Sequence, residues 1–378
     1  MQTSHSNVHS SAGSHILQNI QGHVVGQQVT NQHGVSYRHQ QLVEDKVTIM
    51  HLPTEILAQI FLCCIPEDSD RTPAPHLDPR LLTTVCRRWR EIALDMPSLW
   101  RKLRLEVGRG NWQQRAFCYD TYLKRSRGRQ LSLTLECHND DGKELRSLLQ
   151  PYVNQISSLS FGLSFGASSC PVVAADFGGL EKLVMYTTGS NPALTIAHSV
   201  AHSITQLPPS MRTLKLTDLW LDLKMLSGFN PLAWVNLTNL EIVVDALNCF
   251  PCLLRLCPNL SSLTIIGMFS SVIETPEELP HSKLQSLRIS GDLHLDWMGS
   301  LVLFDFITLP NLRAIEARDV GPWPHEAFKG FLTRSRCPLE SLIFGGGVIT
   351  TRQQLEEYGT LFPSLSVVTD PMRCSFYF

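Results

Sequence analysis

Three cysteines in the second half of the chain are the first candidates for chemistry. Cys249 and Cys252 stand in the stretch CFPC, and Cys257 follows five residues later. Cysteines at this spacing can hold a metal ion or form a redox pair. A structural zinc site needs four ligands, however, and no second pair is spaced to complete one. Because Pro251 suits the opening of a helix and cysteine packs as a small apolar residue, we interpret this stretch as part of an apolar helix face.

Two further motifs give weaker indications, one of a zinc site and one of a phosphate-binding loop. The stretch HSVAH places His198 and His202 on one helical face but lacks the glutamate that follows the first histidine in zinc-protease motifs, so we interpret it as a solvated face. The glycines that begin at Gly345 follow a predicted strand without the Lys-Ser/Thr pair of a phosphate-binding loop. There is no Gly-x-Ser-x-Gly motif and no prominent carboxylate pair. The sequence therefore predicts a protein that is not an enzyme, with no catalytic residue, metal or cofactor.

Residues 1–46 are rich in serine, glutamine, asparagine and histidine. They contain few large apolar residues at any regular spacing, so burial cannot offset the entropy cost of ordering them. We predict a disordered polar tail, with a metal-binding tail as the alternative. The histidines in question, which lack ligand-like spacing, are His5, His9, His15, His23, His33 and His39.

The composition is that of a globular intracellular protein. The chain has 378 residues, 43% hydrophobic and 17% charged, which suits two or three folded units. Its eleven cysteines form no even framework, which indicates reduced thiols. No secretory signal pattern is present, and the longest apolar stretch, ILAQIFLCCI, is far too short to span a bilayer. We predict a soluble protein of the cytoplasm, the nucleus or both.

A helical module is predicted over residues 47–104. Pro53 suits the first position of a helix, and Glu55 lies in its first turn, where a negative charge is favourable. The Pro/Asp-rich stretch from Pro66 to Pro79 must end this helix. The apolar stripe of the helix consists of Ile56, Ile60, Cys63 and Cys64, widened by Leu57 and Phe61.

A second helix of the module is predicted from a stripe that covers about 120° of the helix surface. Its members are Leu82, Val85, Cys86, Trp89, Ile92 and Ala93. Arg88 and Arg90 project from the flanks of the stripe, and Arg87 points away from it. Trp89 is thus expected to be buried with the apolar residues rather than interleaved with the arginines. Two helices this short cannot form an independent core, so we expect them to pack against another part of the chain.

The basic residues of the chain are concentrated in one segment. From Arg80 to Arg129 there are thirteen Lys/Arg and four Asp/Glu, although the net charge of the whole chain is −2. A basic segment with aromatic residues is one signature of nucleic-acid binding. The same asymmetry also suits an acidic protein surface. Nucleic acid remains the less favoured alternative at this stage.

An internal repeat fills residues 151–378. Its unit is an apolar residue, two variable residues, an apolar residue, one variable residue and a third apolar residue. Successive copies begin 23 to 31 residues apart, which is within or just above the period of leucine-rich repeats. The copies begin at Ile156, Leu180, Met211, Leu237, Leu260, Leu284, Leu312, Leu339 and, in degraded form, Leu365. Helix-like segments separate them, so each unit predicts a short strand followed by a returning helix.

The predicted fold class is therefore α/β. A short helical module is followed by a connecting helical and strand segment at residues 105–150 and by a solenoid at residues 151–378, with parallel strands inside and helices outside. A single strand–helix unit cannot bury its apolar face, but about nine stacked units share a continuous core.

The helical module resembles the F-box, the helical unit that docks on the Skp-type adaptor of cullin–RING ubiquitin ligases. The resemblance lies in LPTEILAQIF, which starts at Leu52, and in LLTTVCRRWREIALDMPSLW, which ends at Trp100. The long insertion from Pro66 to Pro79 and the P-x-LW ending are similar to the fungal branch of the family. The residues that the resemblance assigns to adaptor contact or to packing of the two helices are Leu52, Pro53, Ile56, Leu57, Ile60, Phe61, Leu82, Val85, Cys86, Trp89, Leu99 and Trp100.

The resemblance implies a substrate-recognition subunit of an SCF-type ubiquitin ligase, which holds a substrate near a charged enzyme through effective concentration. A non-degradative scaffold that uses the same adaptor contact stays open. The inner face of the solenoid is the default site for a substrate protein. The charged strand positions expected there are Lys215, Glu241, Arg288, Glu316 and Arg318. Their mixed signs suggest a protein partner with its own charge pattern, and no membrane is involved in this prediction.

Overall fold

The computed structural model describes residues 49, 52–64, 79–107, 111–137, 142–164, 173–188, 194–244, 246, 249–267, 279–291 and 302–369. Residues Pro53–Phe378 form one compact unit, separate from Met1–Leu52. Our predictions for the N-terminal tail with its six histidines, and for the loop over residues 66–78, lie outside the described residues.

The helical module contains α1 (Thr54–Cys63), α2 (Pro79–Val85), α3 (Arg87–Asp95) and the 3-10 turn η2 (Pro97–Arg101). Leu57 and Phe61 lie one turn apart on α1 and are fully buried. The ring of Phe61 packs against Trp89 of α3, with their centroids 4.8 Å apart. Pro53 precedes α1 by one position, in extended backbone, rather than opening it as we predicted.

The predicted second helix of the module is wrong as a continuous element, because Cys86 divides it. The backbone of Cys86 is extended, with φ −159° and ψ 172°, and its Sγ accepts a hydrogen bond from the backbone N of Trp89. Cys86 therefore caps the start of α3 and changes the direction of the stripe. Leu82 and Ala93 are buried as predicted, but Val85 is 58% exposed.

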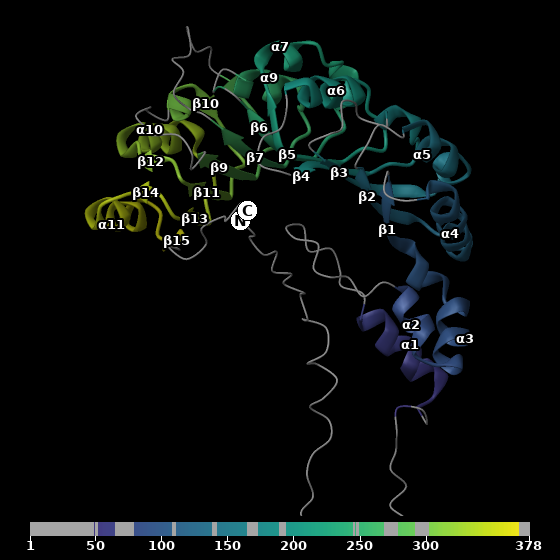
Figure 1. Cartoon of the computed structure of the whole chain (residues 1–378). Coiled ribbons are helices and arrows are strands. Elements are labelled where there is room, and N and C mark those ends of the chain that lie inside the picture. Colours follow the sequence, from purple (N-terminus) through teal and green to yellow (C-terminus); the bar gives the residue numbers. More distant parts are fainter. Residues whose placement is uncertain are drawn as a thin grey trace, which may run out of the picture. The chain divides into compact units, whose positions relative to one another are not determined.

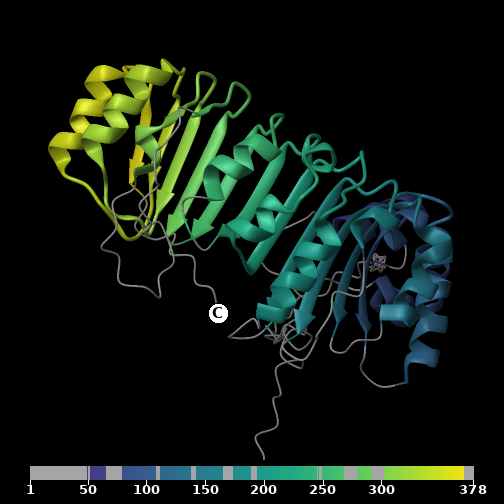
Figure 2. The ribbon, with the colours of Figure 1, turned by 90° about the horizontal axis from the view of Figure 1, so that it is seen from above.

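Eleven parallel strands form the main sheet, and they lie side by side in sequence order (Figure 2). They are β1 (Lys102–Val107), β2 (Leu131–Cys137), β3 (Ile156–Ser164), β4 (Lys182–Thr188), β5 (Thr213–Leu221), β6 (Asn239–Val244), β7 (Ser262–Gly267), β9 (Ser286–Gly291), β11 (Ala314–Arg318), β13 (Ser341–Phe344) and β15 (Ser366–Thr369). Two short parallel pairs form separate sheets, β8 (Leu279–Pro280) with β10 (Ile307–Thr308) and β12 (Gly321–Pro322) with β14 (Val348–Ile349).

Helices cover one face of the sheet, the outer face in Figure 1. They are α4 (Trp112–Arg125), α5 (Gly142–Leu149), α6 (Leu194–Ile204), α7 (Leu223–Ser227), α8 (Pro231–Trp234), α9 (Cys249–Leu256), α10 (His325–Ser335) and α11 (Arg352–Leu361), with 3-10 turns η3 (Gln150–Tyr152), η4 (Ala174–Asp176) and η5 (Val302–Asp305). Because neighbouring strands are parallel, each connection returns the chain to the end of the sheet at which the strands begin.

The repeat predicted from the sequence coincides with the strands. Each of the nine copies lies at the start of a strand, from β3 to β15. In the copy at β7, for example, the first apolar position, Leu260, lies just before the strand and the other two, Leu263 and Ile265, lie in it, and all three are fully buried. Because alternate strand residues point to opposite faces, these side chains meet the helices and form the core. The mixed α/β architecture with a large parallel sheet is thus confirmed.

Side-chain hydrogen bonds also connect the turns of neighbouring repeats. The side-chain amide of Asn259 donates to the carbonyl of Val235, and that of Asn311 donates to the carbonyl of Ser282. At the intervening turn the buried His281 takes this role: its Nδ1 accepts from Leu284 N, so its Nε2 carries the proton that it donates to the carbonyl of Cys257, 3.0 Å away. These side chains satisfy turn carbonyls that the strand ladder does not reach.

The sheet begins earlier than we predicted. We expected residues 105–150 to connect the module to the solenoid, but β1 and β2 pair in register with each other and β2 pairs with β3. Leu131, Leu133 and Leu135 alternate as in the later strands and are buried. The register pairs Leu131 with Ile156, the residue that opens the first copy, but Leu131 stands two residues rather than three before Leu133, so β2 lacks the spacing of the repeat. The segment from β1 to α5 therefore belongs to the same layered architecture.

Candidate protein-interaction surfaces

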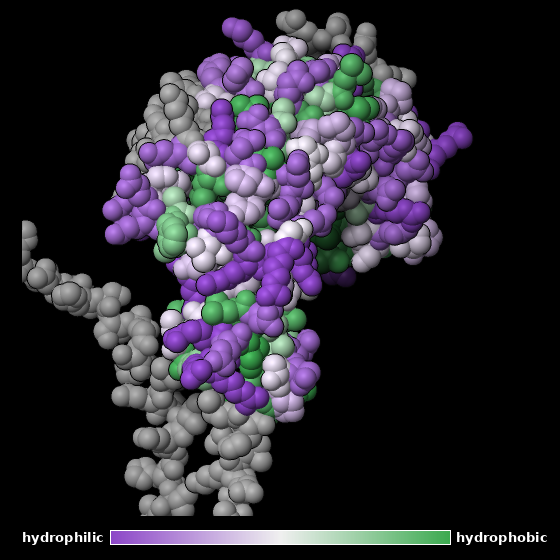
Figure 3. Space-filling model, turned by 90° about the vertical axis from the view of Figure 1, so that its right-hand side faces the viewer, coloured by the Kyte–Doolittle hydropathy of each residue, from purple (hydrophilic) through white to green (hydrophobic). Residues whose placement is uncertain are grey.

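Two helices of the module expose apolar side chains in rows. On α1, Ile56 is 49% exposed and Ile60, one turn later, is half-buried. On α2, Leu81 and Val85 are 52% and 58% exposed and also lie one turn apart. Apolar green surface is visible on the module in the lower part of Figure 3. Exposed apolar rows on adjoining helices are typical of a surface that a protein partner covers.

The resemblance assigned twelve module residues jointly to adaptor contact or to helix packing, and the structure separates them by their burial. Those that pack inside are Leu57, Phe61, Leu82, Leu99 and Trp100. Those that are exposed are Pro53, Ile56 and Val85, and those that are half-buried are Leu52, Ile60, Cys86 and Trp89. Only the second and third groups present atoms that a partner can reach. Leu81, which is exposed on α2, is not among the predicted residues, although its spacing of four residues from Val85 was a signal.

The arginines of α3 lie apart from the buried stripe, as the spacing predicted. Arg87 Nε pairs with Glu91 Oε1 at 2.9 Å, one turn along the helix. Arg90 donates from its Nε to the carbonyl of Thr83 on α2, at 2.8 Å, and so holds the two helices together. Both side chains are exposed, and they give the module a positive rim.

Much of the positive charge between Arg80 and Arg129 is used inside the molecule. The ion pairs of this segment include Arg87–Glu91, Arg104–Glu136, Arg115–Glu106, Lys124–Asp120 and Arg127–Asp95. The guanidinium of Arg125 lies 4.7 Å above the ring of Trp100. Most of these pairs are exposed and contribute little stability, so they do not decide against a phosphate partner, and the nucleic-acid alternative stays a prediction.

The face of the sheet that no described helix covers (Figure 1), called the bare face below, carries four of the five predicted charged residues in one row. Lys215 lies beside Glu241, and Arg288 lies beside Glu316, on directly paired strand positions. Their side chains pair at 3.6 Å and 3.4 Å, and each is about one-fifth exposed. Thr264 of β7 separates the two pairs in the ladder. The row thus alternates in sign and carries little net charge.

Arg318 corrects the prediction for the same face. Its side chain is only 1% exposed and pairs with Glu316. The guanidinium lies over Gly345, where a Cβ atom would be 2.5 Å from Arg318 Cγ and Nη1. The glycine stretch that begins at Gly345 therefore makes room for a buried arginine, and Arg318 is removed from the set that a partner can contact.

The cysteine and histidine motifs that could have held a metal ion or formed a redox pair lie on or beside helices α9 and α6. Cys249 and Cys257 are buried and Cys252 is half-buried, in and just after α9, and burial raises the pKa of the Cys257 thiol to about 12. Helix α9 begins at Cys249, so Pro251 lies in its first turn rather than at its first position. His198 and His202 are exposed on α6. No cluster of three or more metal-ligating side chains occurs within the described ranges.

Comparison with known proteins supports one part of the chain. Residues 49–106 match the family model of the F-box-like domain, which spans the helical module and β1. No curated protein matches the chain. The chain thus carries an F-box-like domain, and domains of this family generally bind Skp-type adaptors. In the part of the chain that the structure describes, no helix is long and apolar enough to cross a membrane.

Proposed function

We propose that the protein is a substrate receptor of an SCF-type cullin–RING ubiquitin ligase, with its module docked on a Skp-type adaptor. The observation that carries this proposal is the coincidence of the F-box-like match with the exposed apolar rows of α1 and α2. When a partner covers a half-exposed apolar side chain, apolar surface is removed from water, which makes binding favourable. Ile56 and Val85 are the residues best placed for this contact.

The test is co-expression with a Skp-type adaptor, followed by affinity purification. Ile56→Asp and Val85→Asp each place a carboxylate where the partner would bury it, so adaptor affinity is expected to fall by about tenfold or more. Leu232→Asp on α8 is the matched control, because Leu232 is 81% exposed and lies outside the module. Retention of the adaptor by both module variants would contradict the proposal.

We assign the bare face of the sheet to substrate binding, as in leucine-rich-repeat solenoids, whose strand–helix units these repeats resemble. The alternating row of Lys215, Glu241, Arg288 and Glu316 supports a protein with a complementary charge pattern rather than a polyanion. Lys215→Glu combined with Arg288→Glu is expected to release a bound substrate while the adaptor stays bound. Arg352→Glu, which alters an exposed arginine on α11, is the control.

Affinity purification in the presence of a proteasome inhibitor separates a degradative receptor from a scaffold. A substrate of a degradative receptor is recovered in larger amount when the proteasome is blocked. A partner recovered equally with and without the inhibitor would favour the scaffold. Recovery of neither an adaptor nor a cullin would contradict both.

A further inference from the structure

Arginines from two separate segments of the chain meet where the helical module joins the sheet. Arg101 ends η2, and its Nε donates a hydrogen bond to the carbonyl of Gln130, 3.2 Å away. Arg129 directly precedes Gln130, and Arg125 lies over the ring of Trp100, the residue before Arg101. We call Arg101, Arg125 and Arg129 the junction arginines. They include none of the residues assigned above to adaptor or substrate binding.

The junction arginines have no acidic partner. Within the part of the chain that the structure describes, none of the three forms an ion pair. The four acidic residues between Arg80 and Arg129 are each paired with another cation. These pairs are Arg87–Glu91, Arg115–Glu106, Lys124–Asp120 and Arg127–Asp95. Three positive charges are therefore brought together without a countercharge.

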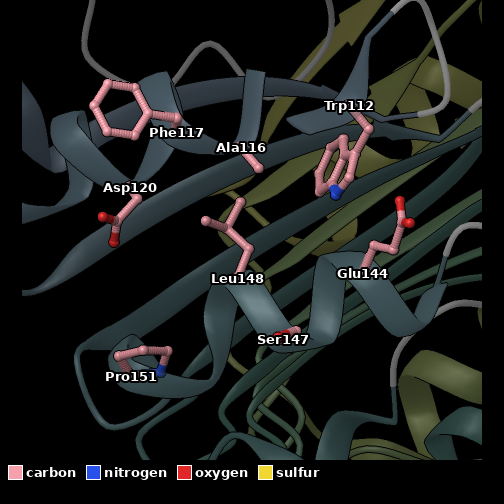
Figure 4. A pocket seen from close by; sticks show the side chains of 8 residues that line it. All are labelled: Trp112, Ala116, Phe117, Asp120, Glu144, Ser147, Leu148 and Pro151. Atoms are coloured by element: carbon pink, nitrogen blue, oxygen red, sulfur yellow. The ribbon is translucent and has the colours of Figure 1, made fainter. Parts of the chain in front are cut away.

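Asp120 is the acidic residue nearest to Arg125 in the sequence, but it lies on another side of α4. Its side chain lines the groove between α4 and α5 (Figure 4). There it accepts a hydrogen bond from Tyr152 at 2.7 Å and pairs with Lys124 at 2.6 Å. An α-helix turns by about 100° per residue, so Arg125, five residues later, lies about 140° away around the helix. Asp120 is thus not placed to neutralise Arg125.

The ring contacts of Arg125 leave its hydrogen-bond donors available. Its guanidinium carbon lies 4.7 Å from the ring centre of Trp100 and 5.6 Å from that of Tyr122. Such contacts engage the positive charge, whereas the five N–H donors of a guanidinium lie in its plane. None of these donors of Arg125 has a hydrogen-bond partner among the described residues. Because Arg125 is half-buried, a carboxylate that meets it gains more than it would at a fully exposed charge.

The turn after α4 keeps Arg129 exposed. Arg127 and Gly128 both have left-handed backbone, with φ 50° and 78°, and no atom lies within 4 Å of the Cβ position of Gly128. The left-handed conformation is costly for a residue other than glycine, and the exposed pair of Arg127 with Asp95 offsets little of that cost. Strained backbone beside unpaired like charges does not stabilise the fold, and proteins keep such features at binding sites.

We propose that the junction arginines bind an acidic segment of a partner protein. Charge complementarity carries this assignment. Three arginines without a countercharge suit closely spaced carboxylates, because a carboxylate accepts charge-assisted hydrogen bonds from a guanidinium. The proposal does not depend on the proposed function, since no junction arginine lies in the apolar rows of α1 and α2.

The aromatic rings at the junction favour a protein over a nucleic acid. Proteins that bind single strands without sequence preference offer accessible rings on which bases stack. Trp100 is fully buried, and Tyr122 is half-buried beneath Arg125. Neither ring is therefore available to a base, so the junction provides positive charge without a stacking surface.

The probe is a fluorescent peptide with capped termini and six glutamates that alternate with glycines. Its binding to the full-length protein, without an adaptor, is measured by fluorescence anisotropy. The same peptide with glutamines is the charge control, and a single-stranded oligonucleotide of equal net charge is the nucleic-acid control. We expect the glutamate peptide to bind at least about tenfold more tightly than either control. Its affinity should fall as the salt concentration rises, because exposed charges are screened.

Variants of the protein locate the site. Arg129→Glu reverses an exposed charge that is bonded to no other side chain, so it should weaken peptide binding about tenfold with the fold intact. Arg125→Gln removes the half-buried charge and should also weaken binding. Arg352→Glu, at an exposed arginine on α11, is the matched control and should leave binding unchanged. All three variants should retain the adaptor, which distinguishes failure of this site from failure of the proposed function.

Three results would overturn the proposal. The first is equal binding of the glutamate and glutamine peptides by the wild type. The second is unchanged binding of the glutamate peptide by both Arg129→Glu and Arg125→Gln, with their fold intact by circular dichroism. The third is tighter binding of the oligonucleotide than of the glutamate peptide, which would assign the junction arginines to nucleic acid.

Discussion

The indole ring of Trp100 stacks on the ring of Tyr122, with centroids 5.4 Å apart and planes 20° from parallel. Trp100 ends the helical module, and Tyr122 lies on α4, the first helix of the layered sheet. The guanidinium of Arg125 covers both rings, at 4.7 Å and 5.6 Å. Nearby, Arg127 Nη2 pairs with Asp95 Oδ1 at 2.7 Å. The helical module and the sheet are thus joined by stacked rings and an ion pair rather than by a free linker.

Trp100→Phe is expected to destabilise the protein by about 1 kcal/mol or more. The ring stack survives this change, but the carbonyl of Ala93 loses its 2.9 Å hydrogen bond from Trp100 Nε1 and keeps only the longer one from Met96 N, 3.4 Å away. Urea denaturation measures the change. Trp112→Phe is the control, because the half-buried Trp112 makes no side-chain hydrogen bond to the described residues. A smaller effect at Trp100 than at Trp112 would contradict the account.

Gly345→Ala is expected to destabilise the protein by about 1–3 kcal/mol, through overpacking. The new Cβ would lie 2.5 Å from Arg318 Cγ, and Arg318 is too deeply buried to move aside. Gly330→Ala is the control: it lies on α10 with open space at its Cβ position, and alanine there should stabilise the helix by about 0.5–1 kcal/mol.

A double-mutant cycle tests the cause of the Gly345 effect. In an Arg318→Ala background the neighbour of the new methyl group is gone, so Gly345→Ala should cost much less than in the wild type. The free energies of unfolding of the four proteins give the coupling. Equal costs in both backgrounds would show that Arg318 is not what the glycine accommodates.

Glu357→Gln is expected to lower the melting temperature at neutral pH but not in acid. Lys329 Nζ, 2.7 Å away, and then His325 Nε2, 2.8 Å away, hold the pKa of the Glu357 carboxyl below its ordinary value. A lowered pKa means that the stabilisation is fully present above the unfolded pKa of about 4.3 and is lost as pH falls through the folded pKa. The difference in melting temperature between wild type and variant should therefore shrink below that pH.

Glu356, the residue before Glu357, is the control for this pH profile. Glu356 forms an exposed pair with Arg352 one turn earlier on α11, and such pairs contribute little. Glu356→Gln should therefore change the melting temperature only slightly at any pH. A Glu357→Gln profile parallel to that of the wild type from neutral to acid pH would contradict the assignment.

The repeat was predictable because its cause is local. Leu260, Leu263 and Ile265 stand at a fixed spacing, and each copy of that spacing builds one strand of a periodic core. The exposed and buried residues of the module were harder to predict. Val85 fits the apolar stripe of an unbroken helix, and only the extended backbone at Cys86 places it in solvent. A spacing argument cannot detect a helix break that depends on a thiol cap.

Arg318 shows a second limit of sequence reasoning. It alternates with core residues, which predicts an accessible charge on the bare face. Its burial depends on a glycine 27 residues later, Gly345, and on the carboxylate of Glu316. Such a long-range fit between an arginine and a missing side chain has no periodic signature, so it could be found only in three dimensions.

The cap at Cys86 gives the last prediction. A thiol is a weak hydrogen-bond acceptor, and Cys86 Sγ accepts from Trp89 N at 3.4 Å. Serine is among the preferred residues at the start of a helix, whereas alanine offers no acceptor. Cys86→Ser should therefore raise the free energy of unfolding by up to about 1 kcal/mol, and Cys86→Ala should lower it. Cys118→Ser, at an exposed position within α4, should leave it nearly unchanged. If Cys86→Ala proved the more stable variant, the break between α2 and α3 would have to come from side-chain packing rather than from the cap.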